Sequence, residues 1–243
     1  MIMAVLFRLM LAAALAVSFS ACGDREKQEN AAAKPVPASP APQSRPETPA
    51  PEPAGDPRPV IAAFGDSLSA GFGLDPGQSY PEDLQRLLDS KGFRFRVVNM
   101  GVSGDTTTDG VERLPSVLSL HPAIVVLEFG GNDGLRGQPV SAAKQNLAKM
   151  ITSLQQAGAQ VVLAGMTLPR NYGPDYIRAF EQMYVELGTE YKLIRIPFLL
   201  EGVGGISRLT QPDGIHPTAE GADIMAHTVF RWLQPLLRKN PNS

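Results

Sequence analysis

Three polar residues in two distant segments have the types that nucleophilic acyl chemistry requires. Ser67 lies in a Gly-Asp-Ser-Leu sequence directly after a short apolar run, and Asp213 and His216 lie near the other end of the chain. A serine hydroxyl is a poor nucleophile until a histidine removes its proton and an acid orients that histidine. The sequence therefore predicts that Ser67, His216 and Asp213 form a catalytic triad.

The spacing of the acid and the histidine supports this prediction. Asp213 and His216 are three residues apart on one loop, so the carboxylate can hold the Nδ1–H of the imidazole while Nε2 faces the serine. Pro217 follows and restricts His216 to an extended backbone, and proline also suits the first turn of a helix. We expect a constrained loop that presents His216 just before the last helix.

Two further loops offer hydrogen-bond donors for the oxyanion that acyl transfer creates. Gly101 follows one apolar run and can present a backbone N–H with no side chain in the way. Asn132 follows the next apolar run, in a Gly-Gly-Asn-Asp sequence, and presents a side-chain amide. The predicted oxyanion hole comprises the Ser67 N–H, the Gly101 N–H and the Asn132 side chain. Each glycine-rich loop, taken alone, can also be an ordinary turn.

Five short apolar runs alternate with amphipathic stretches and must position these residues. The runs are too short and too apolar for surface helices, so they predict buried strands. Ser79 and Glu82 have capping-box spacing at the start of one predicted helix, which closes at Gly92. The predicted strands are Val60–Phe64, Phe95–Asn99, Ala123–Phe129, Gln160–Ala164 and Leu193–Ile196, and the predicted helices are Tyr80–Lys91, Ser141–Ala157, Pro174–Tyr191 and Pro217–Leu237.

This alternation predicts an α/β domain of three layers, with a five-stranded parallel sheet and helices on both faces. In such domains, ligands bind beyond the carboxyl ends of the strands. Apolar residues near these ends could line a groove for an acyl chain, although ordinary loop packing explains them equally well. These groove candidates are Leu74, Leu135, Leu168, Tyr172 and Ile215.

Other polar residues near the motifs have simpler interpretations. Asp133 belongs to a different loop from His216 and is expected to support that loop's turn. Asp66 is expected to be a structural hydrogen-bond acceptor, with tuning of the site as the alternative. His121 and His227 are interpreted as structural or solvent-facing.

The N-terminus predicts export. Arg8 precedes an apolar run, and small residues lead to Cys22, the only cysteine of the chain. Residues 1–21 resemble a bacterial lipoprotein signal, which implies that cleavage leaves Cys22 lipidated at the new N-terminus. An ordinary signal peptide and an uncleaved anchor are the alternatives. We expect a location in the bacterial cell envelope, on a membrane facing the periplasm or the cell surface.

Residues 22–58 are dominated by proline and alanine after a short polar stretch. Ten of the 22 prolines lie between Pro35 and Pro59. Such a composition cannot build a core and predicts a disordered tether between the membrane and a folded domain at residues 59–240.

Whole-chain composition excludes several classes of function. The 243 residues carry a formal net charge of −2 without a basic cluster, so nucleic acid is not expected as a partner. One cysteine and three histidines leave few ligands for a metal site. No metal or other cofactor is predicted, and we expect a monomer.

The motifs together resemble the four sequence blocks of the SGNH, or GDSL, hydrolase family. Gly65-Asp66-Ser67-Leu68, Gly101, Gly131-Asn132-Asp133 and Asp213-Gly214-Ile215-His216-Pro217 occur in the order of those blocks and cover the domain. Longer stretches around them resemble the bacterial subgroup that contains acyl-CoA thioesterase I, lysophospholipase L1 and arylesterase. The resemblance implies a flavodoxin-like fold and the triad and oxyanion residues named above.

The sequence thus predicts an exported serine esterase or thioesterase that forms an acyl-enzyme. Lysophospholipids, fatty-acyl esters and aryl esters are the expected substrates, since thioesters inside the cell are out of reach of an exported enzyme. One alternative is an O-acetyl esterase acting on cell-wall or surface carbohydrate. Another is a tethered binding or scaffold lipoprotein that has kept the fold.

Overall fold

The computed structural model describes residues 56–237. The predicted signal peptide at residues 1–21, the lipidation site Cys22 and all but the last three residues of the predicted tether lie outside the described residues. Within 56–237, no helix is both long enough and apolar enough to cross a membrane.

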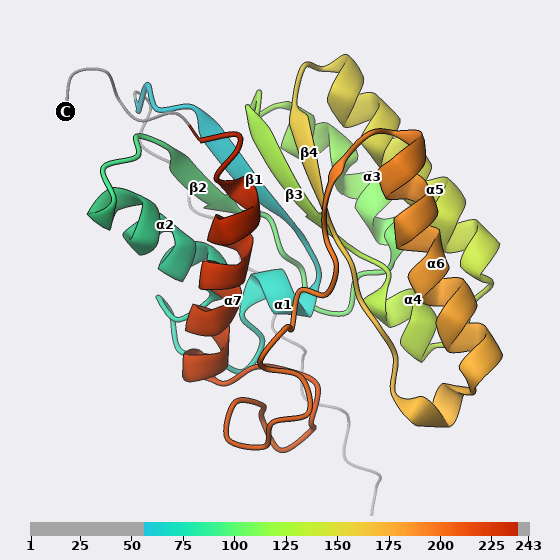
Figure 1. Ribbon diagram of the computed structural model, residues 1–243. Helices are drawn as coiled ribbons and strands as arrows, with labels where there is room; N and C mark the ends of the chain where they lie inside the picture. Colours follow the sequence, from blue (N-terminus) through green and yellow to red (C-terminus); the bar gives the residue numbers. More distant parts are fainter. Residues whose placement is uncertain (1–55, 238–243) are drawn as a thin grey trace, which may run out of the picture. The chain divides into compact units, whose positions relative to one another are not determined.

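A five-stranded parallel sheet forms the centre of the domain and confirms the predicted fold class (Figure 1). Its strands are arranged in the order β2-β1-β3-β4-β5. Every residue of β1 and of β3 is buried, because helices cover both faces of the sheet. The strands are β1 (Val60–Gly65), β2 (Arg96–Asn99), β3 (Ile124–Glu128), β4 (Gln160–Ala164) and β5 (Ile194–Ile196).

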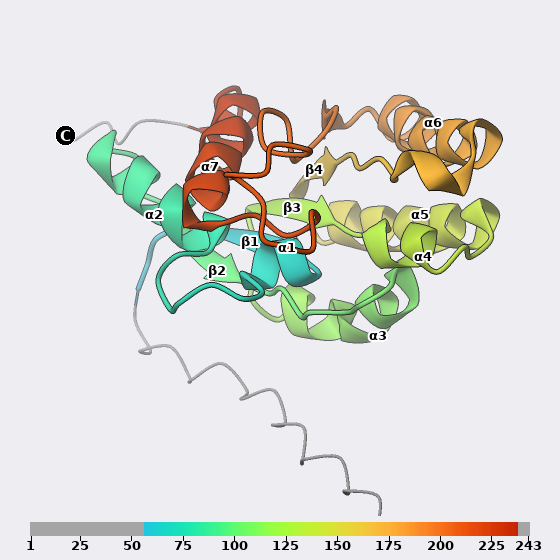
Figure 2. The same cartoon turned by 90° about the horizontal axis from the view of Figure 1, so that it is seen from below.

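Helices form two outer layers. α2 and α7 pack together over one face, and α3, α5 and α6 cover the other (Figures 1 and 2). Two short helices, α1 and α4, begin at the carboxyl ends of β1 and β3. The helices are α1 (Ser67–Ala70), α2 (Tyr80–Ser90), α3 (Thr107–Leu118), α4 (Gly131–Leu135), α5 (Val140–Gln156), α6 (Pro174–Glu190) and α7 (Ala219–Leu233), with a single 3₁₀ turn, η1 (Arg170–Tyr172).

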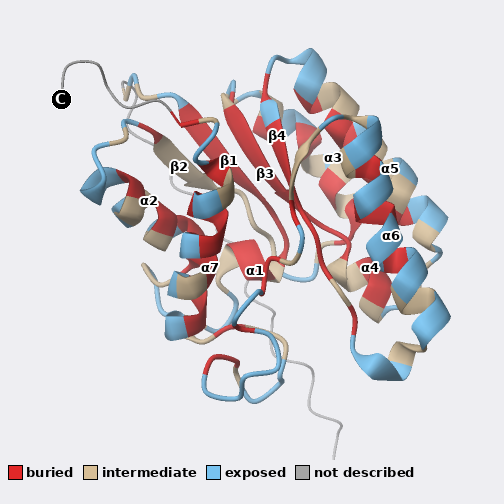
Figure 3. Cartoon of the chain, viewed as in Figure 1, coloured by how far each residue is buried: buried red, intermediate tan, exposed pale blue. Residues whose placement is uncertain are grey.

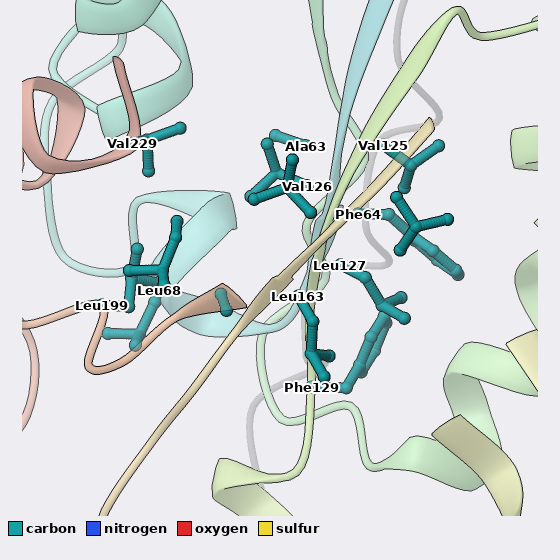
Figure 4. Close-up of a cluster of buried hydrophobic side chains, with 14 of the residues drawn as sticks. Ala63, Phe64, Leu68, Val125, Val126, Leu127, Phe129, Leu163, Leu199 and Val229 are labelled. Carbon is teal, nitrogen blue, oxygen red and sulfur yellow. The ribbon is translucent and has the colours of Figure 1, made fainter. Parts of the chain in front are cut away.

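The core alternates between the two faces of the sheet. Ala63 and Val126 are register partners that face the α7 side, where Val229 also lies. The next partners along the strands, Phe64 and Leu127, face the opposite side (Figure 4). Burial is continuous along the central strands β1 and β3, whereas β2 at the edge of the sheet is only partly buried (Figure 3). This alternation follows from the two-residue period of a strand.

The predicted helices are confirmed, with differences at their ends. Glu82 accepts a hydrogen bond from the Ser79 N–H at 3.0 Å, as the capping-box spacing predicts. α7 is shorter than predicted at both ends. Thr218 caps its start by accepting from the Gly221 N–H, and Pro235 cannot continue a helix.

α3 was missed from the sequence, because Gly110 and Pro115 lie inside it and are typical of loops. A side chain at Gly110 would press against Met150 and Phe129, so this glycine lets α3 lie close to the core. The overlooked signal was the capping box at the start of α3, where Thr106 and its third following residue, Asp109, bond reciprocally.

The order of the strands brings the predicted functional loops together. The chain leaves β1 for β2 on one side, then crosses back to β3 on the other, so β1 and β3 flank a topological switch point. Ligands of open α/β sheets bind at this point, beyond the carboxyl ends of the strands. The loops after β1, β2 and β3 carry Ser67, Gly101 and Asn132 respectively.

Candidate active site

Ser67 lies at a tight turn between β1 and α1. It is the first residue of α1, so its N–H has no acceptor within the helix. Asp66 caps the helix, since its Oδ1 accepts from the Leu68 N–H at 3.1 Å. Gly71 ends the helix in the left-handed conformation, with φ of 78°. The four-residue helix α1 therefore fixes Ser67 at the edge of the sheet.

Glycine is required at position 65 by a carboxyl group beneath the turn. A side chain there would collide with the carboxylate of Glu128 and with the hydroxyl of Ser69. Glu128 Oε2 instead accepts from the Asp66 N–H at 3.0 Å and from Ser69 Oγ at 2.9 Å. The turn that carries Ser67 thus rests on a fully buried glutamate, which the sequence analysis did not identify.

Ser67, His216 and Asp213 lie in a chain of hydrogen bonds. His216 Nε2 is 2.9 Å from Ser67 Oγ, and His216 Nδ1 is 2.6 Å from Asp213 Oδ2. The other carboxylate oxygen of Asp213 accepts from the backbone N–H groups of Ile215 and His216. The structure therefore brings together the three residues predicted to form the triad, with the geometry that a serine nucleophile requires.

Asp213 is held in its ionised form. Partial burial opposes its charge, but the hydrogen bonds from the His216 ring and from the Ile215 and His216 N–H groups outweigh this and lower the pKa of Asp213 to about 2. An ionised carboxylate next to Nδ1 favours the tautomer that leaves Nε2 free to accept the serine proton.

The loop that carries His216 is held to the rest of the site by Gln211. Its side-chain Nε2 donates to the backbone oxygen of Phe72 at 2.7 Å and to that of Pro217 at 2.8 Å. Gly214, with φ of 71°, lets the loop turn back, and Thr210 forms an antiparallel bridge with Pro217.

Phe72 forms one wall beside His216. The two ring centroids are 4.6 Å apart, and Phe72 is 48% exposed. An exposed phenylalanine against the His216 imidazole gives the site an apolar surface, which the sequence analysis missed because Phe72 lies in a glycine-rich loop with no periodic pattern.

Asn132 is the second residue of α4, the short helix that follows β3. Its Nδ2 donates to Asp66 Oδ2 at 3.1 Å and to the backbone oxygen of Asp105 at 2.9 Å. Asp66 therefore connects Asn132 to the Ser67 turn. This is the structural acceptor role expected for Asp66.

Gly101 is not available as predicted. Its N–H already donates to Asn99 Oδ1 at 2.9 Å, and a side chain at Gly101 would collide with the backbone of Ala70. The close approach that requires glycine here is made by α1 and not by a ligand. The structure contradicts the expectation that this N–H is open to substrate.

Gly104, three residues further along the same loop, has the properties expected of Gly101. It is exposed, its φ is 89°, and within the described part of the chain its N–H has no acceptor. Its neighbour Asp105 contacts Asn132 through the carbonyl oxygen. The sequence contained both glycines but gave no means of ranking them.

Two carboxyl groups are buried under the site. Burial, together with the nearby charge of Asp66, raises the pKa of Glu128 well above its usual range. Burial also raises the pKa of Asp66 to about 6, although hydrogen bonds from Leu68 and Asn132 favour its ionised form. Both carboxyl groups therefore hold a proton to a higher pH than an exposed carboxyl group does.

The five groove candidates do not form one set. Tyr172 donates from its hydroxyl to the Leu135 backbone oxygen at 2.7 Å, and Leu168 packs beside Gly134, so Tyr172 and Leu168 lie against α4, to which Leu135 belongs. The other two candidates, Leu74 and Ile215, belong to the loops that follow α1 and precede α7, and both are half-buried.

Asp133 lies outside the triad, as expected. Its carboxylate accepts from the Thr107 N–H at 2.8 Å and from Thr107 Oγ1 at 2.6 Å, which joins α4 to the start of α3. His227 is exposed on α7 and bonds to the Asp223 backbone oxygen. Among the residues that the structure describes, no cluster of His, Cys, Asp or Glu side chains is arranged to hold a metal ion.

Comparisons with known proteins agree with this arrangement. Residues 63–224 match the GDSL-like Lipase/Acylhydrolase family. Esterase TesA of Pseudomonas aeruginosa is 46% identical over 179 residues, covering 73% of this chain and 89% of that protein. Thioesterase 1/protease 1/lysophospholipase L1 of Escherichia coli K12 is 38% identical over 179 residues, covering 73% and 85%. A crystal structure of TesA, 45% identical, has a TM-score of 0.71 and covers 73% of this chain and 99% of its own.

The family match covers most of the described domain, and the two curated relatives are covered over 85% or more of their length. The chain therefore belongs to the GDSL-like lipase/acylhydrolase family and is a hydrolase of the carboxylic ester type.

Proposed function

We propose that the protein is an exported serine esterase whose catalytic triad is Ser67, His216 and Asp213. The observation that carries this proposal is the unbroken chain of hydrogen bonds from Asp213 Oδ2 through His216 to Ser67 Oγ, with lengths of 2.6 and 2.9 Å. It joins two segments that are 149 residues apart in the sequence. A purely structural role would not require an imidazole aimed at a half-exposed serine at the switch point of the sheet.

The mechanism follows from these positions. His216 removes the Ser67 proton through Nε2, and Ser67 Oγ attacks the acyl carbonyl carbon. Asp213 stabilises the imidazolium that forms. His216 then gives its proton to the departing alcohol or thiol, which leaves an acyl-enzyme, and subsequently activates a water molecule that releases the acid.

The oxyanion is held by the Ser67 N–H, the Gly104 N–H and the Asn132 amide. Gly104 replaces Gly101 in this assignment, because the Gly101 N–H already has an acceptor, whereas the Gly104 N–H has none among residues 56–237. Both hydrogens of Asn132 Nδ2 are donated to protein oxygens, so a substrate oxygen must share one of them. Hydrogen bonds of this kind tighten on the ligand only in the reacting complex.

The expected substrates are lysophospholipids, fatty-acyl esters and aryl esters, with thioesters as a further class. The names of the relatives include esterase, thioesterase, lysophospholipase and arylesterase activities. The exposed ring of Phe72 beside His216 supports an apolar acyl group over a carbohydrate.

The place of action rests on the N-terminus. Residues 1–21 and Cys22 favour a lipid anchor, and the proline-rich residues after it favour a tether that lets the domain reach membrane lipids. Labelling of growing cells with an alkyne-tagged palmitate tests this. Label on the mature protein that disappears in Cys22→Ala is expected, and label retained in that variant would contradict the anchor.

Hydrolysis of p-nitrophenyl esters from acetyl to palmitoyl tests the function. We expect rates that peak at medium or long chains and disappear in Ser67→Ala, while Ser90→Ala, which removes an exposed serine of α2, stays fully active. Activity confined to the acetyl ester would move the assignment to carbohydrate deacetylation. Activity that survives in Ser67→Ala would refute the triad.

A further inference from the structure

Arg113 of α3 reaches under the candidate oxyanion loop and contacts three separate acceptors. Its Nη1 donates to the Met100 backbone oxygen at 2.9 Å, its Nη2 to the Gly65 backbone oxygen at 3.1 Å, and its Nε to Asp105 Oδ2 at 2.6 Å. Gly65 is the last residue of β1, and Met100 and Asp105 belong to the loop that follows β2. One guanidinium group therefore joins the loop that carries Ser67 to the loop that carries Gly104.

Arg113 contacts residues on both sides, in the sequence, of Gly104, the glycine assigned to the oxyanion hole. Met100 and Asp105 mark the two ends of the segment 100–105, and Gly104 lies within it. Asp105 uses its side chain for Arg113 and its backbone oxygen for Asn132 Nδ2. Asp105, which Arg113 binds, directly follows Gly104 in the sequence and accepts a hydrogen bond from the Asn132 amide. Arg113 is therefore connected to both donors through one residue.

The surroundings hold the guanidinium itself in place. Its carbon lies 5.1 Å from the ring centroid of Phe64 in β1 and 5.9 Å from that of Phe129, the residue that follows β3. The side chain is only 24% exposed, and its partner Asp105 is 13% exposed. A planar group with donors in a fixed fork, packed against aromatic rings, fixes direction in a way that a lysine ammonium does not.

We propose that Arg113 is a positioning residue that sets the oxyanion hole by fixing the segment 100–105 against the Ser67 turn. This inference rests on the proposed function. Arg113 does not touch the substrate, and its effect passes through the Gly104 N–H and the Asn132 amide. Because preorganised donors act on the charge of the transition state, its loss should lower kcat and leave KM almost unchanged.

The variants for the test are Arg113→Met, Arg113→Lys and Asp105→Asn in the otherwise intact protein. Arg178→Met is the matched control, since it removes an arginine paired with an aspartate on the exposed surface of α6. Each variant is titrated with a fluorophosphonate to count functional Ser67. Then kcat and KM for a p-nitrophenyl ester and the inhibition constant of a trifluoromethyl ketone, which forms a tetrahedral oxyanion on serine, are measured.

For Arg113→Met we expect kcat per titrated site to fall by about 10- to 100-fold, less than the roughly 10²- to 10³-fold cost of deleting an oxyanion donor. KM should stay within about twofold. The inhibition constant of the ketone should rise by the same factor by which kcat falls. Arg113→Lys and Asp105→Asn should lie between this variant and the unchanged control.

A merely structural Arg113 gives a different pattern. Fewer titratable sites with unchanged kcat per site, a rise in KM alone, or unchanged ketone binding would each overturn the proposal. If Arg113→Met does not fold, the same three quantities in Arg113→Lys and Asp105→Asn decide the matter. Failure of the proposed function itself is recognised separately, by activity that persists in Ser67→Ala.

Discussion

The two halves of the candidate active site are built in opposite ways. The Ser67 half consists of the segments that follow β1 and β3. It packs on buried polar groups, with Asp66 3% exposed and Glu128 fully buried. The His216 half lies on the long loop between β5 and α7, where the side chains of His216 and Asp213 are 18% and 38% exposed.

This difference separates the two properties that a mutation can damage. Changes in the Ser67 half disturb a packed core, so they should lower the free energy of unfolding together with activity. Changes in residues 211–216, none of which is buried, should lower activity alone, because exposed loop segments contribute little to global stability. Four substitutions test this contrast.

The largest expected effect comes from His216→Ala. Without the base, Ser67 loses its activation, and we expect kcat to fall by about 10⁴- to 10⁶-fold. The double variant with Ser67→Ala should be no worse, because the two residues act as a unit. His227→Ala, which removes an exposed histidine of α7, is the control and should keep full activity.

The thermal unfolding of His216→Ala completes this test. The free energy of unfolding should change by less than about 1 kcal/mol, as for a change outside the core. A large loss of stability would show that the loop is part of the cooperative core and would break the contrast between the halves.

Gly65→Ala should have the largest effect on stability. The added methyl group would enter the space occupied by the Glu128 carboxylate and the Ser69 hydroxyl, and both are buried and fixed. We expect a loss of about 3 kcal/mol in the free energy of unfolding, at the upper end of the cost of overpacking a core. Denaturant unfolding measures it.

Gly188→Ala is the matched control, because the nearest atoms belong to the flexible side chain of Arg195 and the residue lies inside α6. Alanine favours helices, so this variant should be at least as stable as the natural protein. Equal losses of the free energy of unfolding in Gly65→Ala and Gly188→Ala would mean that the packing beneath Ser67 does not require glycine at position 65.

The same contrast explains what the sequence could predict. Periodicity and turn signals predicted the five strands, because buried strands of a parallel sheet are apolar runs of distinct length. The meeting of Ser67, His216 and Asp213 was predictable because Asp213 and His216 are close in the sequence and the carboxyl ends of parallel strands meet at one edge.

Contacts between distant segments were not predictable in this way. Glu128 looks like the polar end of an apolar strand, and only the fold brings it beneath Asp66, 62 residues earlier. Gly101 and Gly104 differ in which backbone N–H is already bonded, and no local pattern encodes this. Arg113 was missed together with α3, since Gly110 and Pro115 concealed that helix.

Gln211→Ala sharpens the contrast within the His216 half. It removes the two hydrogen bonds that connect this loop to Phe72 and to Pro217. We expect kcat to fall by about tenfold, because a small misplacement of His216 is costly. The free energy of unfolding should change by about 1 kcal/mol or less.

Gln155→Ala is a matched control for Gln211→Ala, because Gln155 also donates from its side-chain amide to a backbone oxygen, that of Tyr191, but far from the site. It should leave kcat unchanged. A loss of stability in Gln211→Ala without a loss of kcat would assign Gln211 to the core and not to the positioning of His216.

The last test concerns the dependence of stability on pH in the Ser67 half. The pKa of Glu128 is raised by burial above its value in the unfolded chain, so the folded protein keeps a proton that the unfolded chain releases. This acid therefore makes stability fall as pH rises between the two pKa values, by up to about 1.4 kcal/mol per pH unit. Glu128→Gln imitates the protonated group and removes this dependence.

The comparison is sharpest above about pH 7. Asp66, whose pKa is about 6, has lost most of its proton there. The difference in the free energy of unfolding, natural protein minus Glu128→Gln, should therefore become more negative as pH rises. Parallel curves would mean that Glu128 is ionised in the folded state, and the support of the Ser67 turn would then be a buried charge held by the Asp66 N–H and the Ser69 hydroxyl.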